Sequence, residues 1–350
     1  MEDNYAAILM RIGRKPFNVE ETDARYPDEN EIVIKNAAVS INPIDGLMQN
    51  GEAVNMTIPA VLGADVAGEV VEVGSQVTRF SVGDRVMGHA LRLATDDDRH
   101  AGFQNHTVLW PNMATKIPPS LSYEDAATMP LGISTAAAAL FQKESLGLER
   151  DGRPRDEWVI VAGATGNVGS HGVRLASAAG YKVLGTASAS SFNLARTLGA
   201  TDLVDYRTPD LAGELARRLA GQKIAGAFDA GGKRDSILPV VQAVAKCDGK
   251  KVVSSVADEL SSKDIPNGVT VVPIFAIAIR EGDVGEWVWG EFLPNVLSNG
   301  KYYLPYPRAR VFGNGLDQIQ AAMDNEEKKD DGTGKPGRAP AGQKTVVTLK

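Results

Sequence analysis

The chain has 350 residues, which is long enough for two domains with separate cores. It carries 44 acidic and 37 basic residues for a net charge of −7, which leaves no basic surface for nucleic acid or an anionic membrane. Its one cysteine, Cys247, excludes internal disulfides and a cysteine-rich zinc lobe. The N-terminus lacks the pattern of a signal peptide, and the longest apolar run, residues 269–279, is too short to span a bilayer. We expect a soluble, cytoplasmic protein without nucleic-acid or membrane partners.

The first 120 residues contain short apolar runs separated by turn residues. Residues 31–43, 64–74 and 83–91 alternate or cluster apolar side chains between Gly, Pro and Asp, which is typical of β-strands. We therefore expect a β-rich domain over residues 1–121. At Ser122 the pattern changes, because a serine followed three residues later by an acid favours a helix start, and an alanine-rich stretch follows.

The next part of the chain alternates strand-like and helix-like segments. Helix-like stretches such as 168–180 and 210–222 lie between apolar runs. This alternation predicts an α/β fold with a doubly wound parallel sheet of Rossmann type over residues 122–300. Residues 301–350 are expected to return to the first domain through a short strand, a helix, a polar loop at 324–343 and a last strand. The six strand candidates of the parallel sheet are residues 157–164, 181–187, 202–206, 226–232, 250–256 and 269–277.

The junction between the first of these strands and its helix reads "GATGNVG". Gly163, Gly166 and Gly169 have the spacing of a turn that brings backbone N–H groups close to the pyrophosphate of a dinucleotide. The positive end of the following helix adds to the attraction. The alternative is that the glycines serve only the tight packing of the helix on the sheet. The other residues predicted to bind the cofactor in this turn are Thr165, Asn167 and Val168.

A cofactor preference follows from the end of the second strand. An NAD site has an acid there for the ribose 2′-hydroxyl, whereas this chain has serines and, one turn into the next helix, an arginine. Hydroxyl donors and a guanidinium bind a 2′-phosphate, which a carboxylate would repel. The alternatives are N-capping for the serines and a solvated helix face for the arginine. We expect NADPH rather than NADH, bound by Ser188, Ser190, Ser191, Arg196 and, at the end of the third strand, Tyr206.

The order of motifs along the chain resembles that of the medium-chain dehydrogenase/reductase superfamily. The stretch "GADVAGEVVEVGSQVTRFSVGDRVMGHA" (63–90) holds G-x-D-x-x-G-x-V and a G-D-R-V turn, and the nucleotide turn follows it. The resemblance covers nearly the whole chain. It implies a GroES-like domain at residues 1–121 and 301–350, with the cofactor in a cleft between this domain and the Rossmann domain.

The zinc alcohol dehydrogenases of this superfamily have a cysteine before the first catalytic helix and a G-H-E motif. In this chain those positions read Asn42-Pro43-Ile44-Asp45 and Gly63-Ala64-Asp65, so the thiolate and imidazole that catalytic zinc needs are absent. We expect no bound metal, and the resemblance is then to the zinc-free quinone oxidoreductases and enoyl reductases. No ligand spacing relates the four histidines, which we expect to be surface or structural residues: His89, His100, His106 and His171.

The resemblance also implies which residues lie near the reacting groups. Asn42 and Thr135 are the polar residues expected nearest the substrate carbonyl and are the candidates for catalysis, while no proton donor is identified. Near the nicotinamide it implies Pro43, Ile44, Asp45 and Gly46, the loop after the fifth strand at Val253 and Ser254, and the loop before the last strand at Gln343 and Lys344. Along the substrate it implies Met129, Pro130, Leu131, Gly132, Ile133, Ser134, Thr135 and Ala136, and the sixth strand at Ile274, Phe275, Ala276, Ile277 and Ala278. A buried alanine-rich helix is the alternative for the first of these two stretches.

The run "MPLGISTAAAALFQKESLGL" (129–148) is similar to fungal trans-acting enoyl reductases that serve iterative polyketide synthases. The likeness implies an NADPH-dependent enoyl reductase of secondary metabolism. Its substrate would be an α,β-unsaturated thioester on a carrier domain, and a synthase would be its transient partner. Two alternatives stay open, an NADPH quinone or small-enone oxidoreductase and a non-catalytic NADPH-binding protein.

Overall fold

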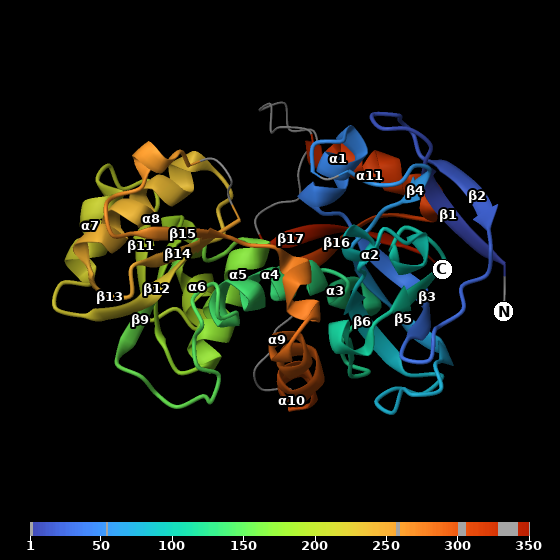
Figure 1. Cartoon of the computed structure of the whole chain (residues 1–350), viewed down its shortest axis with the longest axis horizontal. Coiled ribbons are helices and arrows are strands. Elements are labelled where there is room, and N and C mark those ends of the chain that lie inside the picture. Colours follow the sequence, from blue (N-terminus) through green and yellow to red (C-terminus); the bar gives the residue numbers. More distant parts are fainter. Residues whose placement is uncertain (1–2, 54, 257–259, 300–305, 328–341, 350) are drawn as a thin grey trace. The chain divides into compact units, whose positions relative to one another are not determined.

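The computed structural model describes residues 3–53, 55–256, 260–299, 306–327 and 342–349 (Figure 1). The chain forms two compact units. Unit 1 comprises residues 1–131 and 285–350, and unit 2 comprises residues 132–284. Among the described residues, no helix is both long enough and apolar enough to cross a membrane.

Unit 1 is built on a seven-stranded, mainly antiparallel sheet with the strand order β16-β17-β3-β5-β6-β8 and β7 paired to β3. Strand β5 pairs with β3 on one side and with β6 on the other. Its first residue, Asp65, is therefore paired with Ser40 at the end of β3 and with His89 at the end of β6. The strands are β3 (Ile32–Ser40), β5 (Asp65–Val73), β6 (Arg85–His89), β7 (His106–Leu109), β8 (Ala114–Lys116), β16 (Arg308–Asn314) and β17 (Gln343–Thr348).

A three-stranded sheet of order β2-β1-β4 and several helices complete unit 1. Its apolar core includes Leu9, Ile34, Val66 and Phe103, all fully buried. The smaller sheet consists of β1 (Asn4–Leu9), β2 (Asn18–Thr22) and β4 (Ala60–Val61). The α-helices are α1 (Pro43–Asn50), α2 (Arg92–Thr95), α3 (Tyr123–Ala126), α10 (Leu293–Ser298) and α11 (Ile319–Glu327). The π-helix is η6 (Glu286–Phe292), and the 3₁₀ turns are η1 (Asp98–His100), η2 (Pro111–Met113) and η7 (Leu316–Gln318).

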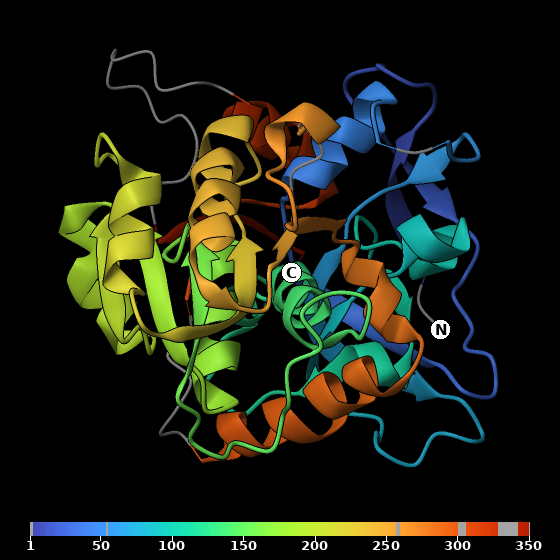
Figure 2. The same ribbon diagram turned by 60° about the vertical axis from the view of Figure 1, so that its left-hand side comes forward.

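Unit 2 is a doubly wound parallel sheet with the strand order β11-β10-β9-β12-β14-β15. Helix α5 packs on β9 and β10 and α6 on β10 and β11, whereas α8 packs on β9, β12 and β14 with α7 beside it. Figure 1 shows these two pairs of helices on opposite faces of the sheet, and Figure 2 shows the same elements turned by 60°. All its strand pairings are parallel, so the predicted α/β fold is confirmed.

The strands of unit 2 are β9 (Glu157–Ala162), β10 (Lys182–Ala187), β11 (Asp202–Asp205), β12 (Lys223–Asp229), β14 (Val252–Ser255) and β15 (Thr270–Pro273), with the short β13 (Asp248–Gly249) paired to β12. The helices are α5 (Asn167–Ala178), α6 (Phe192–Thr197), α7 (Leu211–Arg218) and α8 (Arg234–Lys246). Three 3₁₀ turns are η3 (Ala189–Ser191), η4 (Ser262–Asp264) and η5 (Ala276–Arg280). Helix α4 (Pro130–Phe141) begins where unit 1 ends, and α9 (Asp283–Gly285) ends where unit 1 resumes.

The two units divide at Leu131 and Val284, whereas the domains were predicted to divide after residues 121 and 300. Ser122 does start a helix, because its side chain accepts a hydrogen bond from the Asp125 N–H at 3.1 Å. This helix, α3, packs on β3 and β5 and so belongs to unit 1. The π-helix η6 likewise packs on β8. The boundary predicted between residues 300 and 301 lies outside the described residues.

Candidate functional site

The nucleotide turn of unit 2 has the geometry that a pyrophosphate site requires. Gly163 follows β9 with φ +73°, a conformation that glycine adopts without strain. A β-carbon on Gly169 would lie 2.1 Å from the Gly163 carbonyl oxygen, so only glycine lets the first turn of α5 approach the loop. The Asn167 side-chain oxygen at the start of α5 has no hydrogen-bond partner within the described residues. The turn therefore serves close packing and also presents the N-terminus of α5, as a dinucleotide site does.

The serines after β10 form a small hydroxyl cluster. Ser188 Oγ lies 3.1 Å from Ser190 Oγ and 2.9 Å from Ser191 Oγ. Ser191 precedes α6 as its N-cap residue, but its side chain makes no capping hydrogen bond. The predicted alternative of N-capping is therefore wrong for Ser191. The three serine hydroxyl groups are thus close together and available to donate to a ligand at this turn.

The end of β11 lies against the same turn. The Ala189 N–H donates to Asp205 Oδ2 at 3.1 Å, and the Tyr206 N–H donates to the Ala187 carbonyl at 3.3 Å. Tyr206, predicted to join the serines, is thus adjacent to them and is 51% exposed. Asp205, the acid at the end of the third strand, was not predicted from the sequence. Backbone N–H groups of Ala189 and Arg207 already bind its two carboxylate oxygens.

Two arginines flank the serine turn and Tyr206. Arg196 is exposed on α6, with its guanidinium 5.8 Å from the centre of the Phe192 ring. Arg207, which the sequence analysis missed, lies 5.1 Å from the centre of the Tyr206 ring. Both guanidinium groups are exposed to solvent. Each could therefore be an ordinary surface arginine, and each is also accessible for binding an anion such as a 2′-phosphate.

Val253 and Ser254 lie inside β14, so their predicted position in a loop after the fifth strand is wrong. Both are fully buried, and Ser254 Oγ has no partner within the described residues. The next residue, Ser255, donates to Asp229 Oδ2 at 2.8 Å. Burial raises the pKa of the Asp229 carboxyl group, and the sequence analysis did not identify this acid at the end of β12.

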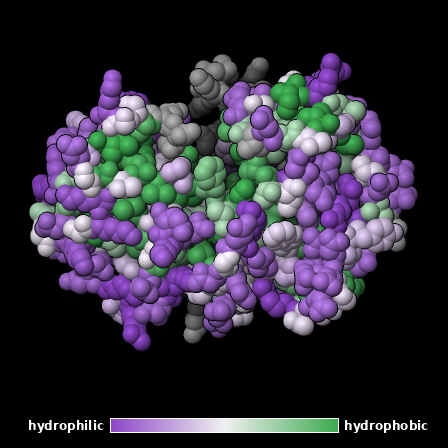
Figure 3. Space-filling view, viewed as in Figure 1, coloured by the Kyte–Doolittle hydropathy of each residue, from purple (hydrophilic) through white to green (hydrophobic). Residues whose placement is uncertain are grey.

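The stretch predicted as the sixth strand is shorter than expected. β15 ends at Pro273, and residues 276–280 form the 3₁₀ turn η5, so Ile274 to Ala278 are not strand residues. The partner strand β14 ends at Ser255, which accepts a last hydrogen bond from the Ile274 N–H at 3.0 Å, so the pairing stops there. Phe275 is 64% exposed. Figure 3 shows that other hydrophobic residues also reach the surface of unit 2, the left-hand part of the view.

Residues 129–136 form the start of α4 and are mostly buried. Met129, Ser134 and Ala136 are fully buried, and Thr135 is 6% exposed. A β-carbon on Gly132 would lie 2.8 Å from both Asn167 Oδ1 and His171 Cδ2, so this glycine lets α4 pack closely on α5. The alternative of a buried alanine-rich helix is confirmed, since Ala136 to Ala139 have no exposed surface. A contact of Thr135 with substrate stays a prediction.

Asp65 is the centre of a buried polar cluster in unit 1. Its carboxylate accepts hydrogen bonds from Ser40 Oγ at 2.9 Å, Asn42 Nδ2 at 2.9 Å and the Leu131 N–H at 2.6 Å. The Lys344 ammonium forms an ion pair with the same carboxylate. Asp65 thus has its charge neutralised and four donors, as a buried carboxylate requires.

Gln343 and Lys344 are the first two residues of β17, so their predicted position in a loop is wrong. Lys344 is only 7% exposed and also donates to the Thr128 carbonyl at 3.2 Å. The pairing of β17 with β3 carries this lysine into the interior, close to the end of β3. The sequence analysis identified Lys344 only as a cofactor contact and missed its ion pair with Asp65.

Asp45 is a second buried carboxyl group beside this cluster, in the first turn of α1. Its Oδ2 accepts a hydrogen bond from the Asn42 N–H at 2.8 Å, and the side chain is 1% exposed. Burial raises the pKa of Asp45 to about 7, against the opposing effect of the Asn42 hydrogen bond, and the charge of Asp65 raises it further. Asp45, predicted only as a residue near the nicotinamide, is thus a second buried acid beside Asp65.

The histidines are buried rather than exposed. His89 is 1% exposed, and its Nδ1 has no hydrogen-bond partner within the described residues. Burial lowers the pKa of His89 to about 4, so its imidazole is neutral at neutral pH. His100 is bound by Glu31 at 2.8 Å and Thr95 at 3.0 Å, and thus has a structural role. Across the described ranges, no three His, Cys, Asp or Glu side chains come together in a way that could hold a metal ion.

A small cavity of about 20 Å³ lies beside Asp45 and His89 in unit 1. This volume suits a single water molecule. The apolar part of its wall includes Ile44, Ala64 and Leu131. The remaining lining residues are Met48, Gly63, Ala90, Arg92 and Leu93. The cavity thus touches both stretches that supply zinc ligands in the zinc dehydrogenases, and here those stretches contribute an acid and small or apolar residues.

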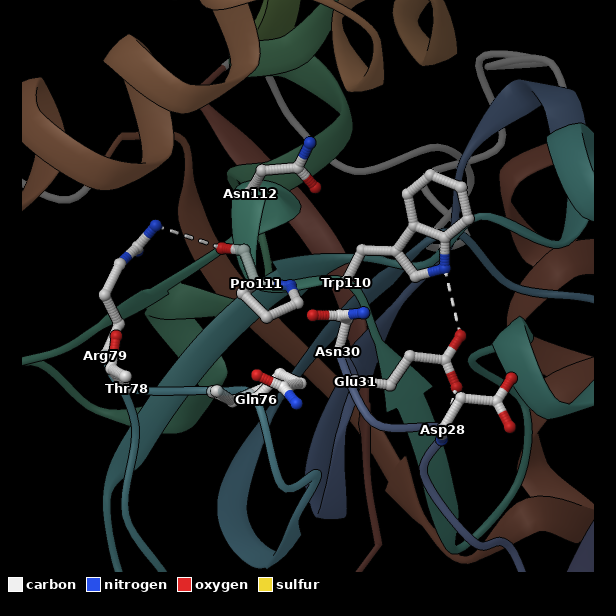
Figure 4. Close-up of a pocket in the computed structure, with 10 residues that line it drawn as sticks. Asp28, Asn30, Glu31, Gln76, Thr78, Arg79, Trp110, Pro111 and Asn112 are labelled. Carbon is white, nitrogen blue, oxygen red and sulfur yellow. Dashed lines mark hydrogen bonds between the residues drawn. The ribbon is translucent and has the colours of Figure 1, made fainter.

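A larger cavity of unit 1, about 510 Å³, is lined by polar side chains (Figure 4). Trp110 Nε1 donates to Glu31 at 3.1 Å, and Arg79 donates to the Pro111 carbonyl at 3.3 Å on the other side of the opening. No residue predicted to bind cofactor or substrate lines this cavity. The smaller cavity, which Asp45 lines, is therefore the candidate site of chemistry in unit 1.

Comparison with known proteins identifies the family. The "Alcohol dehydrogenase GroES-like domain" family matches residues 28–119, and the "Zinc-binding dehydrogenase" family matches residues 167–291. The chain is 40% identical to the "Zinc-binding alcohol dehydrogenase domain-containing protein cipB" of Emericella nidulans, over 99% of this chain and 98% of that protein. The chain belongs to the medium-chain dehydrogenase/reductase superfamily. This dehydrogenase/reductase is an oxidoreductase of the enoyl reductase and quinone oxidoreductase type, with the predicted GroES-like and Rossmann-type parts.

Two further matches concern the activity class. The trans-enoyl reductase himH of Aspergillus japonicus is 34% identical over 92% of this chain and 93% of its own length. The structure of Escherichia coli quinone oxidoreductase complexed with NADPH has a TM-score of 0.68 at 20% identity, covering 98% of this chain and 99% of that one. The second match shows a common fold. The medium-chain dehydrogenase/reductase described here is therefore related to fungal dehydrogenases and trans-enoyl reductases.

Proposed function

We propose that this chain is an NADPH-dependent reductase of activated carbon–carbon double bonds, and specifically a trans-acting enoyl reductase for α,β-unsaturated acyl thioesters of the polyketide type. The observation that carries the proposal is the donor set around Asp65. Asn42 and Ala64 stand where zinc dehydrogenases have their cysteine and histidine, and Lys344 neutralises Asp65. Such a donor set does not suit a zinc ion. An enoyl thioester is already activated by conjugation to its carbonyl, so it needs no Lewis acid for hydride addition.

The residues of unit 2 fit NADPH as the cofactor. The glycine turn and the start of α5 suit the pyrophosphate, because Gly169 leaves the backbone accessible. The hydroxyl groups of Ser188, Ser190 and Ser191 suit the 2′-phosphate, and Arg196 and Tyr206 reach the solvent beside them. Asp205 does not contradict this assignment, since two backbone N–H groups already bind its carboxylate. When bound, NADPH supplies a hydride to the β-carbon of the substrate.

The protein's task is then to orient the thioester and to stabilise the enolate oxygen that develops. We assign that stabilisation to the Thr135 hydroxyl and to the side-chain amide of Asn42. One N–H of this amide donates to Asp65, and we assign its other N–H to the enolate oxygen. The first turn of α1, residues 43–46, contacts the nicotinamide. Apolar side chains among residues 129–136 and 274–278 contact the acyl chain. A carrier domain of a synthase delivers the substrate as a transient partner.

A quinone or small-enone reductase is the second candidate function. It is supported by the fold shared with the NADPH complex of the Escherichia coli quinone oxidoreductase. The same hydride transfer serves a quinone, because a quinone is also a conjugated electrophile. The difference between the two functions lies in the shape of the substrate site rather than in the cofactor.

The test is NADPH oxidation by the purified protein with acyl thioesters that have an α,β double bond, with small free enones and with quinones, side by side. Each assay is repeated with NADH and with a chelator. Turnover of thioesters that depends on NADPH and survives the chelator is the expected result. Preferential turnover of quinones would favour the second candidate, and tight NADPH binding without turnover of any substrate would contradict both.

A further inference from the structure

The carboxyl group of Asp45 caps helix α1, but it also lines a small cavity, which capping alone does not require. It shares the small cavity with His89, and the two side chains are each 1% exposed. His89 Nδ1 lacks a partner within the described residues. A cavity with room for one water and with the polar side chains of Asp45, His89 and Arg92 on its wall is a site where a water binds. Its wall also includes Ile44 and Leu131, two of the residues proposed to contact nicotinamide and substrate.

We propose that Asp45 is the proton store of this enzyme, and that its protonated carboxyl group delivers a proton, through one water held by His89 in this cavity, to the α-carbon of the reduced substrate. The inference rests on the proposed function, because it supplies the proton donor for the double-bond reduction. His89 is a positioning residue in this account, since its neutral Nδ1 accepts a hydrogen bond from the water. Asp45 donates to the same water.

The charges around Asp45 explain why the proton stays there. From β5 comes Asp65 and from β17 comes Lys344, and these two neutralise each other. From β6 comes the neutral His89, and from α2 comes Arg92, whose guanidinium is bound by Asp96 and Asp98. Among these charges, Asp65 raises the pKa of Asp45 and Lys344 lowers it, and burial has the largest effect. The pKa of Asp45, raised to about 7 by its burial, keeps the group a neutral acid in mildly acidic to neutral solution, the range in which a general acid works best.

The proton and electron balance closes without another reagent. The hydride forms the new C–H bond at the β-carbon and leaves an enolate. The water gives a proton to the α-carbon, which forms the second C–H bond, and the Asp45 O–H bond breaks to replace the proton on the water. Asp45 is left as a carboxylate and takes one proton from solvent before the next turnover. The only oxidation and reduction are those of cofactor and substrate.

The first test measures the protonation of Asp45 directly, without cofactor or substrate. Infrared spectra of the full chain are recorded as a function of pH for the wild type and for Asp45→Asn. The asparagine keeps an oxygen that can accept from the Asn42 N–H. We expect the difference spectrum of wild type minus variant to show the carbonyl band of a protonated carboxylic acid that disappears as the pH rises through about 7. Any band of Asp229, whose pKa burial also raises, is common to both proteins and cancels. The matched control, Asp235→Asn on the exposed side of α8, should retain the band.

The second test measures proton delivery in turnover. For Asp45→Asn we expect kcat to fall by about 10²-fold, a general-acid contribution, with a larger solvent isotope effect. The loss of activity at alkaline pH that we expect for the wild type should be absent in this variant. His89→Leu should lower kcat in the same direction, and His89→Gln, which still offers a polar partner to the water, should restore part of it. His89→Leu also replaces Asp45→Asn as the test if the latter does not fold.

The outcomes separate the two proposals. If the wild type reduces no double bond at all, the proposed function fails, whereas the infrared titration still decides whether Asp45 stores a proton. If the wild type reduces enoyl thioesters but both variants keep its kcat and pH profile, the proton-store assignment is overturned and the proposed function stands. A wild-type spectrum without a titrating acid band near neutral pH would also overturn the assignment.

Discussion

The serine turn of unit 2 and the Asp65 cluster of unit 1 are both polar, but the chain builds them in different ways. Ser188, Ser190 and Ser191 are neighbours in sequence, and their hydroxyl groups meet within one turn at the surface. Asp65 and Lys344 are separated by 279 residues and meet in the interior through strand pairing. A local, solvated site can change its ligand without endangering the fold. The buried cluster cannot lose a member without leaving a charge or a donor unsatisfied.

The largest effect should come from breaking the buried ion pair. Lys344→Met leaves Asp65 as an uncompensated buried charge, and we expect the free energy of unfolding to fall by about 3–5 kcal/mol. Urea denaturation of the cofactor-free protein measures it. Lys143→Met, at an exposed lysine, is the matched control and should change stability by less than about 0.5 kcal/mol. If the two substitutions lowered the free energy of unfolding equally, the buried ion pair would contribute no more to stability than an exposed lysine does.

The second effect is a pH dependence of the free energy of unfolding that Asp45 should cause and that exposed acids should not. The folded pKa of Asp45, about 7, lies above the ordinary value of 3.8, so its contribution to stability is complete below pH 3.8 and is lost as the pH rises through 7. The full loss amounts to about 4 kcal/mol, because one pKa unit corresponds to about 1.4 kcal/mol. Asp45→Asn should remove this loss, so the variant should gain stability relative to the wild type between pH 5 and 8. A stability difference that does not change across this range would show that Asp45 is charged in the folded protein.

A third, smaller effect tests the nucleotide turn. Gly169→Ala puts a β-carbon 2.1 Å from the Gly163 carbonyl oxygen, so the loop and α5 must separate, at a cost of about 1–3 kcal/mol. The fluorescence of bound NADPH should report weaker binding by at least tenfold. In Gly166→Ala the new β-carbon would lie 3.3 Å from the same oxygen, so this variant should lose much less NADPH affinity. Unchanged affinity in Gly169→Ala would argue against pyrophosphate binding at this turn.

The smallest effect concerns cofactor choice at the serine turn. Ser188→Asp places a carboxylate where we expect the 2′-phosphate, so NADPH binding should weaken by about 10-fold or more, corresponding to about 1.4 kcal/mol, while NADH binding should change little. Isothermal titration with both cofactors measures the ratio. Asn193→Asp adds the same charge on the exposed side of α6 and should leave the ratio unchanged. An equal loss for both cofactors in Ser188→Asp would remove the 2′-phosphate assignment.

The same comparison explains what could be predicted from sequence. The parallel sheet and the glycine turn follow from patterns within a few residues. The sheet was confirmed and the glycines do form a tight strand-to-helix turn, whereas pyrophosphate binding there stays a prediction. The relation of Asp65 to His89 and Lys344 depends on strand register, which no local pattern in the sequence indicates. There was one indication in the sequence that Asp45 and Asp65 lie close together. Both lie in stretches that correspond to those with zinc ligands in the zinc alcohol dehydrogenases. The ends of β14 and β15 were misjudged because apolar residues continue past the last paired residue, as at Ile274.

The proposed reduction places the hydride on the β-carbon of the substrate and the proton on its α-carbon. The direct measurement is one turnover of an α,β-unsaturated thioester with NADPH deuterated at the transferred position, followed by mass spectrometry and NMR of the product. The account predicts one deuterium at the β-carbon and, in deuterated water with unlabelled cofactor, one deuterium at the α-carbon. A product that takes no deuterium from the cofactor, or NADPH that is consumed only when a quinone is present, would contradict it.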